Sequence, residues 1–268
     1  MLREGLFLAE GPQAVREAVR AHADAVRAGG SGPVKDLYVT GEAAARYAAE
    51  VALAADARVR VSEVTDEVLA AMTDTVSPQG LLAVCRPVDV PLDEFVLAAP
   101  RLVAVAAHVR DPGNAGTLVR AADAAGADGV VVSSASVDVY NPKCVRSTAG
   151  SLFHLDLTID ADLVEAVGRL REAGLRVLAA DGDGDVDLDD LLDEAEVAGA
   201  ASVLAQPVAW LFGNEAWGLP PELLDLADAV VRVPVHGRAE SLNLATAATV
   251  CLYASARGQR RARRSEAG

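Results

Sequence analysis

Short continuous apolar runs alternate with amphipathic helical segments through the C-terminal two thirds of the chain, and this alternation most restricts its fold. Runs without polar alternation are typical of strands buried on both faces of a sheet. Parallel strands need helical crossovers, so the alternation predicts an α/β fold with a mostly parallel sheet. The predicted strands are Leu102–Val109, Gly129–Ser133, Leu175–Ala180, Val208–Phe212 and Ala229–Val233, and the main helices are Gly116–Ala125, Ala161–Ala173 and Leu242–Arg257.

A second, smaller alternation of strands and helices fills residues 1–90. Glycines and a proline at 29–33 interrupt it, and prolines at 87, 91 and 100 separate it from the C-terminal pattern. We therefore predict a small α/β domain at 1–90, a linker at 91–100 and a larger domain at 101–268. The predicted strands of the small domain are Val34–Val39, Arg58–Val61 and Leu81–Cys85, and its helices are Pro12–Ala28, Glu42–Leu53 and Thr65–Met72.

Composition restricts the compartment and the partners. Three scattered cysteines without metal-ligand spacing favour a reducing, cytoplasmic setting, buried thiols and no metal site. The longest apolar runs are strand-sized, so we expect no membrane span. The net charge of −15 argues against broad nonspecific binding to nucleic acid. Arginines at 257, 260, 261, 263 and 264 either complement the dipole of a last helix or contact phosphate, and charge alone leaves both open.

Two polar residues follow the first strand of the larger domain. Asn114 is placed to cap the helix after that strand, which by itself explains an asparagine there. Arg120 lies within two turns of Asn114 and can project from the same end of the helix. It can equally pair with Asp123, three residues later.

Glycines surround a carboxylate at the end of another predicted strand. Glu215 stands between Gly213 and Gly218, where open α/β sheets bind ligands, or it hydrogen-bonds to the amides of its own loop. Glycine lets backbone groups approach a ligand closely. Farther on, Ser241 taken alone is a helix cap and Asn243 a polar residue of the first turn. Together these features suit a polar cofactor held mainly by backbone.

Three segments carry a family resemblance. DPGNAGTLVR at 111–120, LFGNEAWGL at 211–219 and VPVHGRAESLNLATA at 233–247 resemble the three motifs of the SpoU (TrmH-type) RNA 2′-O-ribose methyltransferases. The segment at 139–153 is similar to the family's segment after the second strand. GLFLAEG at 5–11 resembles the start of the ribosomal L30e-type RNA-binding domain that many rRNA-directed members carry.

The resemblance implies a deep trefoil knot in the larger domain, an L30e-like smaller domain and S-adenosylmethionine as the methyl donor, without a metal. It implies a homodimer that methylates a ribose 2′-hydroxyl of RNA, in the first place of 23S rRNA. By analogy, the cofactor is held by Ala180, Leu211, Gly213, Val233, Leu242 and Asn243, the active-site positions are Asn114, Arg120, Glu215, Ser241 and Asn243, and RNA is bound by Arg120 and Arg146.

Alternative functions stay open from the residues alone. A relative that methylates tRNA and a non-catalytic RNA-binding factor of ribosome assembly share the same fold. A nucleotide-dependent dehydrogenase disagrees with the sequence, which lacks the glycine fingerprint of that class. Antibiotic resistance and housekeeping modification are equally compatible with a 23S rRNA substrate.

Overall fold

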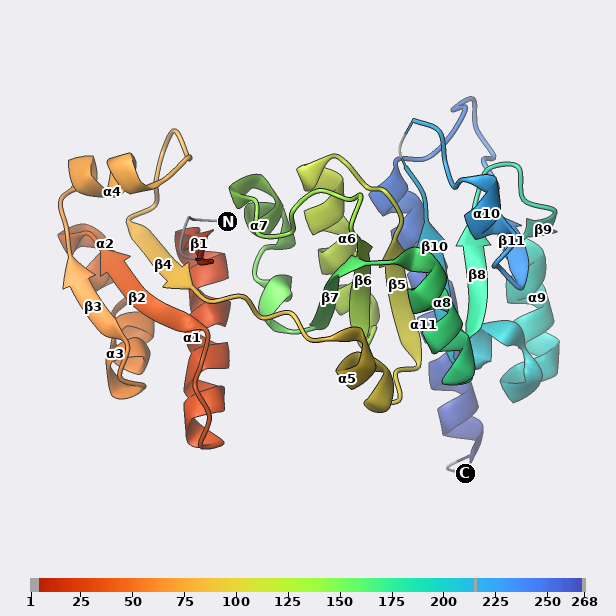
Figure 1. Cartoon of the computed structure of the whole chain (residues 1–268), viewed down its shortest axis with the longest axis horizontal. Helices are drawn as coiled ribbons and strands as arrows, with labels where there is room; N and C mark the ends of the chain where they lie inside the picture. Colours follow the sequence, from red (N-terminus) through yellow and green to blue (C-terminus); the bar gives the residue numbers. More distant parts are fainter. Residues whose placement is uncertain (1–4, 215, 267–268) are drawn as a thin grey trace. The chain divides into compact units, whose positions relative to one another are not determined.

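The structure, a computed structural model, describes residues 5–214 and 216–266, with side chains up to Arg264 (Figure 1). The chain forms two compact units. The first contains residues up to Val88 together with Asp138–His154, and the second contains Asp89–Val137 and the chain from Leu155. The units are therefore not contiguous in the sequence, because a segment from the middle of the chain packs with the N-terminal part.

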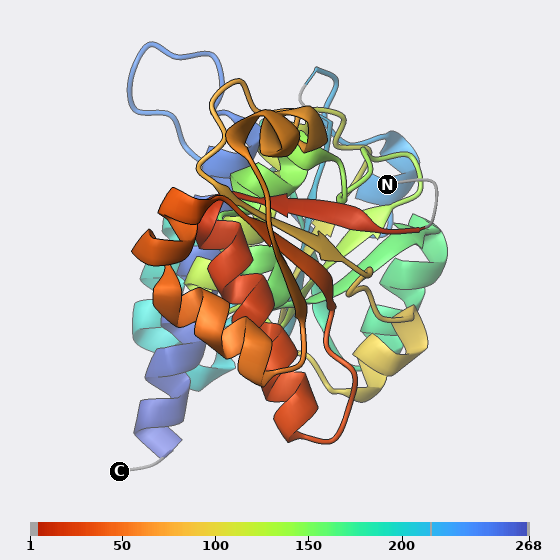
Figure 2. The same cartoon turned by 90° about the vertical axis from the view of Figure 1, so that its left-hand side faces the viewer.

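The first unit contains a four-stranded sheet in the order β1-β4-β2-β3. Strand β4 pairs antiparallel with both β1 and β2, whereas β2 and β3 are parallel. Helices α1 and α3 lie together against this sheet (Figure 2). The elements are β1 (Phe7–Glu10), α1 (Gly11–Arg27), β2 (Val34–Val39), α2 (Gly41–Arg46), α3 (Ala48–Asp56), β3 (Arg60–Glu63), α4 (Asp66–Met72), β4 (Leu81–Cys85), α7 (Pro142–Thr148) and the 3-10 turn η1 (Ser151–Phe153).

The predicted helix Glu42–Leu53 is two helices. Tyr47 ends α2 and precedes α3, with φ −114° and ψ 38°, outside the helical region. The guanidinium of Arg46 lies 5.4 Å from the Tyr47 ring centroid. Strand β1 was absent from the predicted strands, although its residues lie within the segment 5–11 that carries the family resemblance.

The second unit contains a seven-stranded sheet in the order β7-β6-β5-β10-β8-β11-β9, and all its described strand pairs are parallel. The predicted α/β fold with a mostly parallel sheet is confirmed. Its strands are β5 (Leu102–Ala106), β6 (Gly129–Ser133), β7 (Asp156–Ala161), β8 (Arg176–Ala180), β9 (Val186–Asp187), β10 (Val208–Phe212) and β11 (Ala229–Arg232).

Helices cover both faces of this sheet (Figure 1). Helices α5 and α8 pack over one face, where Phe95 and Val167 meet the inward side chains of the strands. Helices α6 and α11 pack on each other and on the opposite face. The helices of the unit are α5 (Leu92–Leu97), α6 (Pro112–Ala125), α8 (Leu163–Glu172), α9 (Leu188–Ala198), α10 (Pro221–Leu224) and α11 (Leu244–Glu266), with 3-10 turns η2 (Gly199–Ala201) and η3 (Val203–Ala205).

The stretch predicted as a linker, 91–100, contains helix α5. Phe95 is buried in the core of the second unit, and the Val90 amide donates to the Leu157 carbonyl at 2.7 Å. The prolines therefore mark the start of a packed helix, and this stretch belongs to the second unit. The contiguous domains 1–90 and 101–268 stay a prediction.

The strand order agrees with the predicted knot. Strand β11 lies between β8 and β9, which the earlier segment 181–185 already joins. After β11 the chain returns to pack α11 against α6, near the other half of the sheet. A late strand inserted between two strands that are already joined agrees with a knotted chain, and true knots are rare among folds.

Candidate functional site

The carboxyl ends of β5, β10, β8 and β11 lie side by side. Phe212 is in register with Ala106 on one side and with Ala180 on the other, and Ala180 is in register with Val231. The predicted cofactor residues Ala180, Leu211 and Gly213 therefore meet at one edge. In open α/β sheets, ligands bind at this edge.

Gly213 and Gly218 hold a narrow hairpin after β10. Asn214 and Gly218 exchange two backbone hydrogen bonds, of 2.8 and 2.9 Å. A Cβ on Gly213 would lie 2.4 Å from the Gly218 carbonyl carbon, so only glycine fits there. Gly218 has φ +71°, and a Cβ on it would lie 2.9 Å from a carboxylate oxygen of Asp181, in the loop after β8. The exits of β8 and β10 therefore approach each other closely.

This edge fits a cofactor held by backbone. Glycine at 213 leaves no side chain there, and apolar side chains remain partly exposed along the chain after β11, at Val235 and Leu242. Val233 is half-buried at the end of β11. Exposed aliphatic groups beside strand-end amides and carbonyls suit a ligand with both a flat apolar ring and polar groups.

Asn114 and Asn243 are far apart in the sequence of the second unit but lie next to each other in the fold. The Asn243 Nδ2 donates to the Asn114 Oδ1 at 2.9 Å, across 129 residues of sequence. Asn243 also caps α11, because its Oδ1 accepts hydrogen bonds from the amides of Ala245 and Thr246 at 3.0 and 3.4 Å. Two of the predicted active-site residues are thus in direct contact.

Two capping predictions were wrong. The cap of α6 is Asp111, whose carboxylate accepts from the Asn114 amide at 2.9 Å. Pro112 occupies the first turn, where its missing N–H costs nothing, so the helix begins earlier than predicted. Asn114 therefore lies inside the first turn with its side chain available to Asn243. Likewise, Asn243 rather than Ser241 caps the last helix, which begins at Leu244.

The other predicted site residues differ in how the structure presents them. Arg120 is exposed on α6, and within the described part of the chain its guanidinium has no hydrogen-bond or ion-pair partner. Ser241 and Leu242 are exposed in the loop before α11. Glu215 lies outside the described residues.

Sequence reasoning did not single out three residues at the same edge. The Asn214 side chain is buried and donates to the His108 carbonyl at 2.8 Å, joining the β5 and β10 exits. The rings of His108 and Trp217 lie 5.5 Å apart between centroids. Asn214 and Trp217 stand inside the quoted motif at 211–219, so the motif was the available signal for them. Nothing in the local pattern indicates His108.

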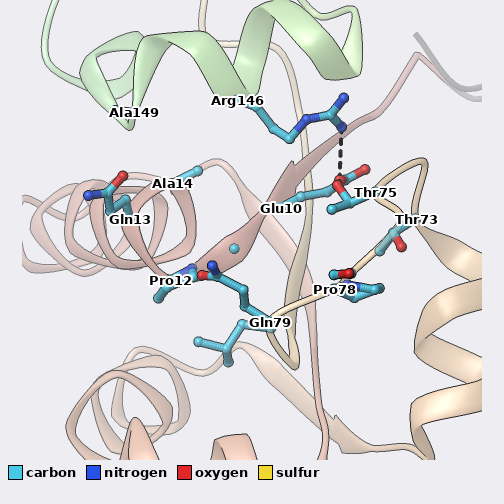
Figure 3. A pocket seen from close by; sticks show the side chains of 13 residues that line it. Glu10, Pro12, Gln13, Ala14, Thr73, Thr75, Pro78, Gln79, Arg146 and Ala149 are labelled. Atoms are coloured by element: carbon cyan, nitrogen blue, oxygen red, sulfur yellow. Dashed lines mark hydrogen bonds and ion pairs between the residues drawn. The ribbon is translucent and has the colours of Figure 1, made fainter.

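Arg146 lies in the first unit, at a cavity of about 360 Å³ (Figure 3). Its Nη1 donates to the Glu10 carboxylate at 2.9 Å, and the Glu10 side chain is 5% exposed. Glu10 also accepts from the Thr75 hydroxyl and the Asp74 amide. The carboxylate therefore fixes Arg146 at the cavity wall, which also contains Gln13 and Gln79.

Two of the C-terminal arginines form ion pairs. Arg257 and Arg261 contact the same carboxylate, Glu196 on α9, at 2.7 and 3.2 Å. These two side chains therefore bind α11 to α9, an acidic helix. The alternative of a phosphate-contacting tail stays open for Arg263 and Arg264, which are exposed.

The cysteines do not contribute to the chemistry of this edge. Burial raises the pKa of the Cys85 thiol, and it raises that of Cys251 to about 12. Thiols with such pKa values are not nucleophiles at neutral pH. Within the described residues, no helix has both the length and the apolar character to span a bilayer.

Comparisons with known proteins identify relatives of both parts of the chain. A sequence model described as the SpoU rRNA Methylase family matches residues 101–253. A model described as RNA 2′-O ribose methyltransferase substrate binding matches residues 8–91.

Named relatives and solved structures match at about one third identity. The chain is 32% identical to a 23S rRNA (guanosine(2553)-2′-O)-methyltransferase of Bacillus subtilis, over 92% of this chain and 87% of the relative. It is 35% identical to a 23S rRNA (uridine(2479)-2′-O)-methyltransferase of Streptomyces viridochromogenes, over 67% of this chain and 60% of the relative. An AdoMet-bound rRNA methyltransferase from Sinorhizobium meliloti superposes with a TM-score of 0.75 at 30% identity, over 95% of this chain and 88% of that one.

Proposed function

Because the chain belongs to the SpoU rRNA methylase family, we propose that it transfers the methyl group of S-adenosylmethionine to a ribose 2′-hydroxyl of 23S rRNA. The observation that carries this proposal is the contact between Asn114 and Asn243 at the carboxyl edge of the sheet. It joins two separate motifs beside the strand exits that we propose as the cofactor site. The printed activities of the Bacillus and Streptomyces relatives support the rRNA substrate.

The proposed cofactor residues are Ala180, Leu211, Gly213, Val233, Leu242 and Asn243. Bound there, S-adenosylmethionine supplies a sulfonium methyl group that is already activated for displacement. The chain's own contribution is to hold the ribose hydroxyl in line with that methyl group and to keep water away from it. Asn114 and Asn243, fixed to each other and to the start of α11, provide amide groups in a set geometry for this positioning.

Arg120 is proposed to act as a clamp on the developing alkoxide and a neighbouring phosphate. A 2′-hydroxyl is a poor nucleophile, so its proton must leave as attack proceeds. An arginine is almost never neutral in a protein, which makes a guanidinium unsuited as the base. The proton is then lost to water or to an RNA phosphate, while the planar guanidinium donates hydrogen bonds to the oxyanion. Glu215 and Ser241 complete the proposed site.

The remaining proposals concern assembly and compartment. We propose a homodimer in the cytoplasm, with the first unit binding RNA and Arg146 presented at its cavity by Glu10. Sedimentation of the purified chain tests the dimer, and a monomer at micromolar concentration contradicts it. Arg146→Ala should weaken RNA binding without changing the affinity for S-adenosylmethionine.

The substrate is tested by mapping ribose methylation on total RNA from a strain that lacks this protein. The proposal expects the loss of one 2′-O-methyl mark from 23S rRNA and its return when the purified chain and S-adenosylmethionine are added. Loss of a mark from tRNA instead would contradict the rRNA substrate. Failure to bind S-adenosylmethionine in a calorimeter would contradict the enzyme and favour a non-catalytic RNA-binding factor.

The role of Arg120 is tested by pH–rate profiles of the wild type and Arg120→Lys. If Arg120 acts as a clamp, Arg120→Lys should have little activity, because an ammonium cannot reproduce the planar pair of donors. Near-full activity with a shifted acid limb in the lysine variant would instead support a true base.

A further inference from the structure

An exposed tryptophan projects from the hairpin after β10, beside the proposed active site. The Trp217 side chain is 52% exposed, whereas the chain's other tryptophan, Trp210, is fully buried and hydrogen-bonded to Ser255 at 2.9 Å. An exposed indole offers a large, rigid aromatic surface on which a ligand can stack. Trp217 lies in the segment between β10 and α10, which follows the carboxyl end of β10.

The partner of Trp217 is held in an unusual backbone conformation. His108 has φ +58°, a region that costs free energy for a residue with a Cβ. The His108 amide donates to Ser133 Oγ at 3.0 Å, and its carbonyl accepts from Asn214 Nδ2 at 2.8 Å. The hydroxyls of Ser133 and Ser136 are themselves 2.9 Å apart. These bonds hold the His108 backbone at the exit of β5, where its ring lies beside that of Trp217.

The two rings form a platform rather than two separate side chains. Their centroids are 5.5 Å apart and their planes are inclined by 53°, within the range of a favourable aromatic pair. Asn214 is bonded both to the His108 carbonyl and to the Ala216 amide, so the strand exit and the hairpin tip are connected by one buried side chain. These bonds hold the backbone on either side of the pair, and the Trp217 ring contacts the His108 ring.

We propose that the pair formed by Trp217 and His108 is a stacking platform for one unpaired nucleobase of the RNA substrate. The inference rests on the proposed function and specifies how the RNA is held at that site. Proteins bind unpaired bases by stacking them on aromatic rings, which tolerates all four bases. Because the chain carries a net charge of −15, general attraction to phosphate is weak, and affinity at the site must come from such local contacts. Arg110 and Arg120, both exposed on this side, supply local cations.

The test compares RNA with and without one base. Five single-stranded RNA decamers are used, four differing in the central nucleotide and one abasic at that position. Full-length wild type should bind the four complete decamers at least about 10-fold more tightly than the abasic one. Trp217→Ala should abolish this difference, and Trp217→Phe should keep most of it. Leu97→Ala is the matched control, since it removes an 84% exposed apolar side chain of α5.

Fluorescence gives a second readout of the same binding. RNA should quench the emission of wild type but not that of Trp217→Phe, whose only tryptophan is the buried Trp210. The inference is overturned if the complete and abasic decamers bind wild type equally, or if no decamer binds. It is also overturned if Trp217→Ala changes the sedimentation of the protein, because the ring would then belong to an interface between copies of the chain.

These outcomes are distinct from those of the proposed function. Base-dependent binding without methyl transfer to any rRNA would contradict the proposed activity and leave the platform standing. Methyl transfer together with RNA binding that does not depend on the central base would support the proposed activity and contradict the platform. The affinity of Trp217→Ala for S-adenosylmethionine should equal that of the wild type, which excludes a collapse of the strand exits.

Discussion

The Asn243 side chain has two roles, and one substitution can separate them. Its Oδ1 caps α11, and its Nδ2 donates to Asn114. An N-cap contributes about 1 kcal/mol to the free energy of unfolding. The contact with Asn114 is exposed and contributes less to stability, so we expect its main effect on the geometry of the site.

Asn243→Ser should keep the stability of the wild type and lose most of the activity. Serine caps helices about as well as asparagine but has no Nδ2 group. We expect a free energy of unfolding within about 0.5 kcal/mol of wild type and at least about 10-fold lower kcat. Urea unfolding and methyl-transfer rates check this.

Asn243→Ala is the companion variant, and it should lose both the cap and the activity. Wild-type activity in Asn243→Ser would contradict a role for the contact with Asn114. Equal destabilisation of both variants would contradict the assigned cap.

His22 is buried in the first unit as a neutral ring. Its Nδ1 accepts from the Val34 amide at 3.0 Å, and its Nε2 lies 3.3 Å from the Ala57 carbonyl, which assigns the proton to Nε2. Burial lowers the pKa of His22 below its usual value. A proton added at Nδ1 would also face the Val34 N–H, so the folded state disfavours the charged ring.

Stability of the first unit should therefore fall in mild acid. The unfolded chain takes up a proton near pH 6.5 and the folded chain does not, so the contribution of His22 is complete above about pH 6.5. It is lost as the pH falls below that value, at up to about 1.4 kcal/mol per pH unit. Urea unfolding at pH 7.5 and 5.5 measures the loss, which should be smaller in His22→Gln. His236→Gln, at an exposed histidine, should behave as wild type; identical pH dependence in all three proteins would refute the assignment.

At the scale of elements, the hairpin 213–218 depends on the absence of a side chain at Gly213. Gly213→Ala would place a Cβ 2.4 Å from the Gly218 carbonyl carbon, so the backbone of the hairpin must move. We expect a loss of about 1–3 kcal/mol in stability and at least a tenfold loss in affinity for S-adenosylmethionine. Calorimetric titration and urea unfolding are the measurements.

Gly168→Ala supplies the matched control for that substitution. Gly168 lies within α8, and a Cβ added there would meet no atom within 4 Å, so alanine should stabilise the helix by up to about 1 kcal/mol and leave cofactor binding unchanged. Wild-type cofactor affinity in Gly213→Ala would show that the hairpin does not shape the site.

The bounds of the strands and helices show which elements a local sequence pattern can predict. The strands β2, β4, β6 and β10 have the predicted bounds, and β4 and β10 are unbroken runs of buried apolar side chains. Strand β9 has two residues and β7 carries polar side chains at alternate positions, so neither forms a continuous apolar run. Helix α11 extends past its predicted end at Arg257, since ion pairs from Arg257 and Arg261 to Glu196 hold its last turns.

At the scale of the whole molecule, buried thiols report the opening of each unit. Cys85 lies in β4 of the first unit and Cys251 in α11 of the second, and both are fully buried. A thiol reagent can reach them only after local or global unfolding. Single-cysteine variants therefore measure the two units separately.

S-adenosylmethionine should protect one unit and not the other. At 100 times its dissociation constant it should slow labelling of Cys251 about 100-fold, because it binds only the folded second unit. Labelling of Cys85 should be unchanged. No protection at Cys251 would contradict the cofactor site, and equal protection at both would show that the units unfold together.

Local sequence patterns were enough to predict the fold class, most of the strands and the motifs of the site. A strand that is buried on both faces of a sheet is a run of consecutive apolar residues. Each family motif is likewise a short run of consecutive residues, so both can be recognised in the sequence. The placement of Asn114 and Asn243 at helix starts, and of Arg120 farther along α6, follows from those runs.

Which of these residues meet depends on how the chain folds in three dimensions. The contact of Asn243 with Asn114, the pairing of His108 with Trp217 and the capture of Arg146 by Glu10 join residues that are 129, 109 and 136 positions apart. Local patterns record whether a side chain is buried and how it repeats, but not its partner in space. The first two pairs form only when β10 and the segments after it lie beside strands from earlier in the chain, and the third forms only when α7 packs against β1.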